Sequence, residues 1–136
     1  MHGVRGRPRL LLVDDTVAQR DLYEMALGDE FTVFTASRGA EGIAVASHAL
    51  PDVIVLDVMM PGMDGWETCT RLKCADVTAD IPVILLTAID DLDLTQHATA
   101  VGASAVLRKP CSPEALRSSI LSALNGRAQD DPRLRA

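Results

Sequence analysis

The chain has 136 residues, 48% of them hydrophobic, and a formal net charge of −6, which suits one domain with a single core. The acidic balance, with basic clusters only near the two ends, argues against direct binding of nucleic acid. No signal-peptide pattern occurs and no apolar stretch approaches the about 20 residues of a membrane span, so we expect a cytoplasmic protein without a membrane partner.

Strand and helix patterns alternate along the chain. Short apolar runs predict five strands, at residues 10–13, 31–35, 53–56, 83–86 and 105–107. The second of these alternates apolar residues with threonine, which indicates an edge strand. Apolar residues at helical spacing predict a helix after each strand. The expected inward-facing residues are Ala18, Leu22, Met25 and Ala26; Ala40, Ile43 and Ala44; Trp66, Cys69 and Leu72; Leu94, Ala98 and Val101; and Leu116, Ile120, Ala123 and Leu124.

The two ends differ in composition from the middle. Residues 1–8 form a basic lead that we expect to be flexible, residues 9–124 form the domain, and residues 125–136 form a polar tail that we expect to be disordered. Thr16 with Gln19 predicts a capping box for the first helix. Ser112 followed by Pro113 predicts the start of the last helix.

Strict alternation of strand and helix predicts an α/β fold, a doubly wound parallel sheet with right-handed crossovers and helices on both faces. The five-stranded, flavodoxin-like version of this fold has the strand order 2-1-3-4-5. In that order, polar residues end several strands at one edge of the sheet. They are Asp14 and Asp15 after the first strand, Asp57 after the third, Thr87 after the fourth and Lys109 after the fifth.

Charge determines the chemistry that these residues favour. Taken singly, each is as readily a helix cap, a strand end or a surface charge. Together, three carboxylates repel one another, so one pKa should rise unless a cation lies among them. A hard divalent ion such as Mg²⁺ prefers oxygen ligands of this kind. With Lys109 also present, the site could hold a phosphoryl group, and Asp57 has the features of a nucleophile that forms an aspartyl-phosphate.

Four segments carry a family resemblance. They are LLLVDD (residues 10–15), VIVLDVMMPGMDG (residues 53–65), ILLTA (residues 84–88) and GASAVLRKP (residues 102–110). With these segments at these separations, the chain resembles the receiver domain of bacterial two-component response regulators, from about Arg9 to Leu124. The chain is then either a stand-alone receiver or part of a longer regulator.

The resemblance implies a phosphorylation-controlled switch rather than an enzyme with an external substrate. Asp57 would be the phosphoacceptor, and its phosphoryl group would come from a phosphohistidine on a sensor histidine kinase or a histidine phosphotransfer protein. Mg²⁺ or Mn²⁺ would be bound by Asp14, Asp15, Asp57 and the backbone carbonyl of Met59. The output partner is unknown, and we expect a monomer or a weak dimer that depends on phosphorylation.

The resemblance also implies roles around the phosphoryl group. Thr87, Ala88 and Lys109 would bind it and relay the switch, and the Lys109–Pro110 peptide bond would be cis. This chain departs from the family pattern in two places. Val106 stands where the switch aromatic is usual, and Ile89 stands where many members carry a polar residue. With Met59, Ile89 should tune hydrolysis of the phosphoryl group.

Two other functions compete with this interpretation. The alternative is an aspartyl-nucleophile phosphohydrolase that resembles haloacid-dehalogenase-like enzymes, but these carry a second aspartate where this chain has Met59. A flavin or nucleotide carrier would need a glycine-rich or Ser/Thr-rich loop after the first strand, where Asp14 and Asp15 would repel phosphate.

Overall fold

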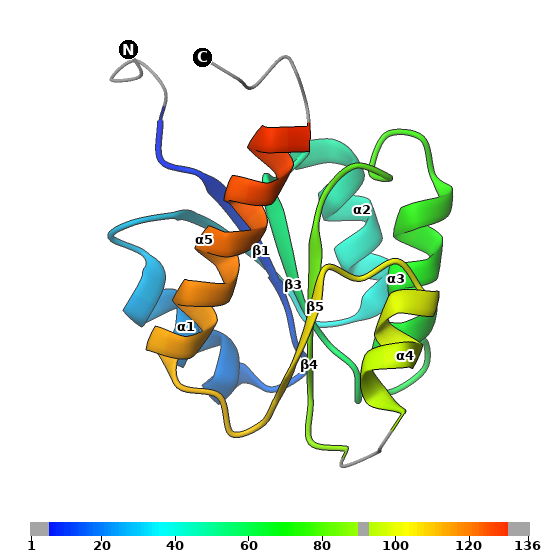
Figure 1. The fold of residues 1–136 in the computed structure, drawn as a ribbon. Helices are drawn as coiled ribbons and strands as arrows, with labels where there is room; N and C mark the ends of the chain where they lie inside the picture. The colour runs from blue at the N-terminus through cyan, green and yellow to red at the C-terminus, as the bar shows by residue number, and fades with distance from the viewer. Residues whose placement is uncertain (1–5, 90–92, 131–136) are drawn as a thin grey trace.

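A computed structural model describes residues 6–89 and 93–130 of the chain. Its five parallel strands form one sheet in the order β2-β1-β3-β4-β5, as predicted. In chain order the elements are β1 (Arg9–Val13), α1 (Val17–Leu27), β2 (Thr32–Ala36), α2 (Gly39–Ala49), β3 (Val53–Asp57), α3 (Gly65–Cys74), β4 (Val83–Thr87), α4 (Leu94–Ala100), β5 (Ala105–Arg108) and α5 (Pro113–Asp130). Helices α1 and α5 cover one face of the sheet, and α2, α3 and α4 cover the other (Figure 1).

Two hydrophobic cores lie on the two faces of the sheet. Successive side chains of a strand point to opposite faces, so Ile54 and Leu56 of β3 join the core beneath α2, α3 and α4. Val53 and Val55 join the core beneath α1 and α5. All five residues of β3 are buried, and full burial of one such side chain contributes about 1.5–3 kcal/mol.

The strand pairing brings the predicted polar residues to one edge. Val13 pairs with Leu56 in the β1–β3 ladder, so the residues that follow, Asp14 and Asp57, are neighbours. In the β4–β5 ladder Thr87 pairs with Arg108, which places Lys109 one residue beyond. Because all strands are parallel, their carboxyl ends share this edge.

The predicted inner face of α1 is wrong. Tyr23 and Leu27 are its buried residues, whereas Leu22 is 48% exposed and Met25 is 83% exposed. Ala18 and Ala26 are exposed as well. The apolar residues are more numerous on the outer side of this helix, and the large side chain of Tyr23 determines the side that packs.

The predicted face of α2 is also largely wrong. Gly39, Gly42 and Ala46 are its buried residues, while Ala40 and Ala44 are exposed. Helix α2 lies so close to β1 that a Cβ at Gly42 would come within 2.9 Å of the Val13 side chain. Small residues therefore form its inner face, which a search for large apolar residues misses.

The other three helices pack on the predicted faces. Cys69 and Leu72 of α3, Leu94 and Ala98 of α4, and Leu116 and Ile120 of α5 are buried. The capping box at α1 is absent, since Thr16 makes no side-chain cap hydrogen bond. At α5, Ser112 Oγ accepts from the amide of Ala115 at 3.1 Å, as expected of the cap.

Helix α5 continues through Asp130, so residues 125–130 are helical rather than part of a disordered tail. Residues 131–136 and 1–5 lie outside the described residues. Within the lead, Arg7 donates to the Gly28 carbonyl at 2.8 Å, and the Pro8 carbonyl accepts from Thr32 at 2.8 Å. None of the described helices combines the length and the apolar character needed to cross a membrane.

Candidate phosphoryl-transfer and metal site

Three carboxylates gather at the carboxyl edge of the sheet. One oxygen each of Asp14, Asp15 and Asp57 lies within 4.8 Å of the others. Asp14 and Asp57 are 5% and 4% exposed, whereas Asp15 is exposed to solvent. Oxygen donors of this charge, partly open to water, are the ligands that hard divalent cations prefer. The donor set therefore fits a divalent cation.

Asp57 is the carboxylate at the end of the fully buried β3. Its Oδ1 accepts a hydrogen bond from the amide of Met59 at 3.3 Å and lies 3.3 Å from Nζ of Lys109. Burial, and secondly the charge of Asp14, raise the pKa of the Asp57 carboxyl above its ordinary value, and Lys109 acts in the opposite direction. Without a bound cation, burial and the neighbouring carboxylate therefore disfavour ionisation of Asp57.

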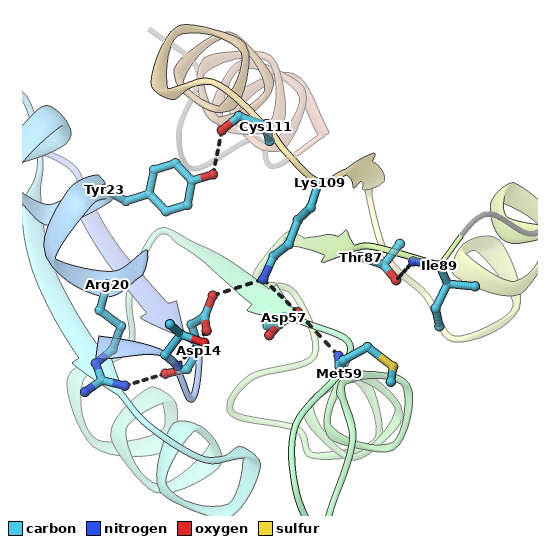
Figure 2. Close-up of polar contacts among 10 residues, drawn as sticks. Asp14, Arg20, Tyr23, Asp57, Met59, Thr87, Ile89, Lys109 and Cys111 are labelled. Atoms are coloured by element: carbon cyan, nitrogen blue, oxygen red, sulfur yellow. Dashed lines mark hydrogen bonds and ion pairs between the residues drawn. The ribbon is translucent and has the colours of Figure 1, made fainter. Parts of the chain in front are cut away.

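Lys109 lies between the two buried carboxylates. Its Nζ is 3.4 Å from Oδ2 of Asp14 and 3.3 Å from Oδ1 of Asp57, as Figure 2 shows. Its amide donates to the Thr87 carbonyl at 2.8 Å, which fixes the backbone at the end of β5. The Lys109–Pro110 peptide bond that follows is cis.

Asp14 is held by backbone and side-chain contacts from the start of α1. Its Oδ1 accepts from the amide of Thr16 at 2.9 Å. Arg20 donates from its guanidinium to the Asp14 carbonyl at 2.6 Å, a contact that the sequence reasoning missed. The signal in the sequence was a basic side chain on the first turns of a helix that directly follows a site-bearing strand.

The loop after β4 places the remaining polar group. Thr87 is fully buried, and its hydroxyl oxygen accepts from the amide of Ile89 at 3.0 Å. Ala88 between them is exposed, and Ile89 is half-buried. Val106 on β5 is partly buried and packs against the core beneath α2, α3 and α4. Met59, after β3, is 57% exposed.

Gly65 allows the loop after Asp57 to return to the sheet. A Cβ at Gly65 would come 2.5 Å from the Asp57 carbonyl oxygen and 2.6 Å from Cα of Val58, so α3 can begin this close to the site only with glycine. Asp64 before it accepts from the amide of Glu67 at 2.9 Å and caps the helix. The loop that follows the candidate nucleophile is thus anchored at both ends.

The site brings together a candidate nucleophile, carboxylates that can bind a metal ion, and the ammonium group of a lysine. Asp57 can attack an electrophilic phosphorus, the carboxylates of Asp14 and Asp15 can hold a divalent ion, and Lys109 can pair with an anionic oxygen. Two further residues at the site, Arg20 and Tyr23, contact its backbone rather than its reacting groups.

The chain is similar in sequence to known regulatory proteins. The chain is 46% identical over 103 residues to the "Response regulator PleD" of Caulobacter vibrioides, covering 75% of this chain and 23% of the relative. It is 36% identical over 118 residues to the "DNA-binding dual master transcriptional regulator RpaA" of Synechocystis, covering 86% of this chain and 49% of the relative. The chain thus spans from about a quarter to about half of the length of these relatives.

Solved structures show the same fold. The chemotaxis protein CheY4 of Vibrio cholerae superposes with a TM-score of 0.82 at 33% identity, covering 87% of this chain and 99% of that one. A response regulator receiver domain protein from Clostridium thermocellum superposes with a TM-score of 0.83 at 29% identity, covering 91% and 99%.

The model of the response regulator receiver domain family matches residues 10–121. This match includes every residue of the polar cluster at the carboxyl edge. The chain therefore belongs to the response regulator receiver domain family of two-component systems, whose members are switches in phosphorylation-dependent signalling with histidine kinases.

Proposed function

We propose that Asp57 accepts a phosphoryl group from a phosphohistidine on a sensor histidine kinase or a histidine phosphotransfer protein, in a reaction that depends on Mg²⁺ or Mn²⁺. The observation that carries this proposal is the position of Asp57. It is a buried carboxylate 3.3 Å from the ammonium of Lys109 and within 4.8 Å of two further carboxylates. A side chain placed in this way is poorly suited to stability alone, because burial and like charge both oppose its ionisation.

The transfer itself needs few protein groups. A carboxylate oxygen of Asp57 attacks phosphorus in line with the departing imidazole nitrogen, the P–N bond breaks, and the imidazole takes up a proton from solvent. The product is an acyl phosphate on Asp57. A divalent cation held by Asp14, Asp15, Asp57 and the Met59 carbonyl would neutralise charge on the phosphoryl oxygens. Lys109, already beside Oδ1 of Asp57, would pair with another of these oxygens.

Thr87 and the loop after it would carry the signal. The Thr87 hydroxyl is fully buried at the end of β4, on the strand that pairs with β3 and its Asp57, and the amide of Ala88 is next in the chain. Turning toward a phosphoryl oxygen would loosen the contact between the Thr87 oxygen and the amide of Ile89. The altered surface would then bind an output partner, in the cytoplasm, as a monomer or a weak phosphorylation-dependent dimer.

The outer face of α1 is the proposed docking surface for the phosphodonor. Leu22 and Met25, three residues apart and so neighbours on the helix surface, are 48% and 83% exposed on it, and Val17 in the first turn is 59% exposed. A donor that presents its phosphohistidine to Asp57 must approach this edge of the sheet. A donor helix with apolar residues would bury Leu22 and Met25. Met25→Lys should then slow transfer from a phosphorylated histidine protein but leave labelling by acetyl phosphate unchanged; loss of both would contradict this assignment.

Acetyl phosphate with Mg²⁺, followed by intact-mass measurement, tests the proposal. The wild type should gain one phosphoryl group, and Asp57→Asn should gain none. Asp76→Asn, at an exposed aspartate in the loop after α3, is the matched control and should be labelled like the wild type. Labelling that survives in Asp57→Asn would exclude Asp57 as the acceptor. Multiple turnovers of released phosphate would favour the phosphohydrolase instead, and no gain in mass would favour a carrier.

A further inference from the structure

Tyr23 connects α1 to the loop that carries Lys109. Its hydroxyl donates to the backbone carbonyl of Cys111 at 2.6 Å, a contact between residues 88 positions apart. Cys111 comes two residues after Lys109, on the far side of Pro110. Figure 2 shows the Tyr23 hydroxyl pointing at Cys111, in the same segment from which the Lys109 side chain extends toward Asp57.

The ring and the hydroxyl of Tyr23 have separate tasks. The residue is 2% exposed, and its ring belongs to the core beneath α1 and α5, with Leu116 and Ile120. Packing would be served equally by phenylalanine. The hydroxyl instead reaches a backbone carbonyl, that of Cys111, so it constrains the position of that segment as well as satisfying a buried polar group.

The segment between Lys109 and α5 has its strand end and its helix end fixed separately. At the strand end, the Lys109 amide donates to the Thr87 carbonyl at 2.8 Å. At the helix end, Ser112 caps α5 through the amide of Ala115. Between the two, the Cys111 carbonyl is tied across to Tyr23. The position of Nζ of Lys109, 3.3–3.4 Å from two carboxylates, depends on where this short segment lies.

We infer that Tyr23 is a positioning residue, whose hydroxyl holds the segment after β5 so that the Lys109 ammonium lies between Asp14 and Asp57. The positioning of Lys109 does not depend on the proposed function. Its expected consequence, faster phosphoryl transfer to Asp57, rests on that function. Tyr23 does not touch the reacting atoms and acts through Lys109. Its effect on the reaction should therefore vanish when Lys109 is removed.

The chain offers a direct measurement of the Lys109 position. Lys73 and Lys109 are its two lysines. Lys73 lies elsewhere, at the end of α3, where its Nζ donates to the carbonyls of Ala79 at 3.1 Å and Ile81 at 2.5 Å. Acylation of the metal-free protein with an amine-reactive ester, followed by peptide mass spectrometry, reports both lysines in one sample. Lys73 serves as the internal reference.

Tyr23→Phe should raise the acylation rate of Lys109 about two- to fivefold and leave that of Lys73 unchanged, because a misplaced ammonium loses its carboxylate partners and its protection. Thr78→Val is the reciprocal control. Thr78 is 1% exposed, and its hydroxyl donates to the Leu72 carbonyl at 2.6 Å, next to the Lys73 site. This variant should change Lys73 and not Lys109. Equal acylation of Lys109 in wild type and Tyr23→Phe would overturn the inference.

The phosphorylation arm uses the same variants with acetyl phosphate and Mg²⁺. Tyr23→Phe should lower the labelling rate about three- to tenfold, and Thr78→Val should not. In a Lys109→Ala background, adding Tyr23→Phe should cause no further loss. A further loss of the same size would show that Tyr23 acts independently of Lys109 and would refute the inference. If the wild type is not phosphorylated at all, the proposed function fails, while the acylation arm still decides the role of Tyr23.

Discussion

The amide of Met59 donates to Oδ1 of Asp57 across 3.3 Å, so Met59 lies directly beside the candidate nucleophile. That side chain is 57% exposed. On the neighbouring loop, the amide of Ile89 donates to the hydroxyl oxygen of Thr87 at 3.0 Å. We propose that these two apolar side chains, of Met59 and Ile89, flank the place where water would attack an aspartyl-phosphate.

We expect the phosphorylated form to be long-lived for this reason. Neither Met59 nor Ile89 can hydrogen-bond an attacking water, and loss of one orienting hydrogen bond raises the barrier by about 1.4–2.7 kcal/mol, or about ten- to a hundredfold in rate. Met59→Asn with Ile89→Glu should therefore accelerate the loss of phosphorylated mass by that factor. Met25→Asn, at an exposed methionine on α1, should not. A double variant that decays no faster than wild type would refute the mechanism.

Mg²⁺ should stabilise the protein against heat at neutral pH. The clustered carboxylates of Asp14, Asp15 and Asp57 repel one another when no cation is bound, and saturation at about 100 times Kd adds roughly 2.7 kcal/mol to the free energy of unfolding. Replacing Asp14 and Asp15 by Asn removes two of the repelling charges, so it should raise the metal-free Tm and remove most of the response to Mg²⁺. The side-chain amide oxygen of an asparagine at position 14 can still accept the hydrogen bond from the amide of Thr16. Thermal unfolding in Mg²⁺ and in EDTA measures both effects, and superimposable curves for wild type would count against a metal site.

The stability of the metal-free protein should depend on the titration of Asp57. Burial and the charge of Asp14 raise the pKa of the Asp57 carboxyl above the ordinary 3.8. Between pH 3.8 and this raised pKa, the folded state therefore binds more protons than the unfolded chain. The free energy of unfolding therefore falls as the pH rises through this window and stays reduced above it.

Asp57→Asn lacks this titration. In EDTA at neutral pH it should have a higher Tm than the wild type, and the difference should shrink as the pH is lowered through the window toward 3.8. Asp76→Asn should match the wild type at each pH. A difference in Tm that is constant with pH would show that the raised pKa of Asp57 makes no contribution.

Phosphorylation should alter the loop after β4 more than the face formed by α4, β5 and α5. Thr87 ends the strand that pairs with β3 beside Asp57, whereas Val106 is a small, partly buried side chain with no ring to rotate. Chemical-shift mapping with a beryllofluoride mimic should give its largest changes at residues 87–89 and near Asp57. Equally large changes across α4, β5 and α5 would show that a valine at position 106 does not limit the switch.

Leu50 is a site at which a single change should stabilise the fold. It ends α2 with φ +49° and ψ +63°, a left-handed conformation that costs a residue with a Cβ about 1–2 kcal/mol. Its side chain is 51% exposed. Leu50→Gly should raise the free energy of unfolding by about 0.5–1 kcal/mol net of the greater entropy of an unfolded glycine.

The neighbouring position supplies the control for this prediction. Ala49→Gly, inside the last turn of the same helix, should lower the free energy of unfolding by about 0.5–1 kcal/mol. Urea denaturation of both variants measures the two signs. Destabilisation by Leu50→Gly equal to that of Ala49→Gly would show that the left-handed conformation carries no strain.

The sequence by itself determined the strand–helix alternation and the polar residues at the strand ends. Apolar runs such as residues 53–56 and 83–86 are local signals, because a strand buried on both faces needs an unbroken series of apolar side chains. A polar residue directly after such a run lies at the carboxyl edge whatever the details of packing. Asp57 and Thr87 could therefore be assigned to one site before any coordinates were known.

Only the tertiary structure decided which side of a helix packs and which side chains support the site from a distance. Helix α1 has more exposed apolar residues than buried ones, so periodicity selected Leu22 and Met25. The Tyr23 ring instead packs with residues of α5, and the opposite side of the helix is buried. The contact of Tyr23 with Cys111 spans 88 positions. No local pattern encodes such a contact, because it arises only when the sheet brings the start of the chain beside the loop after β5.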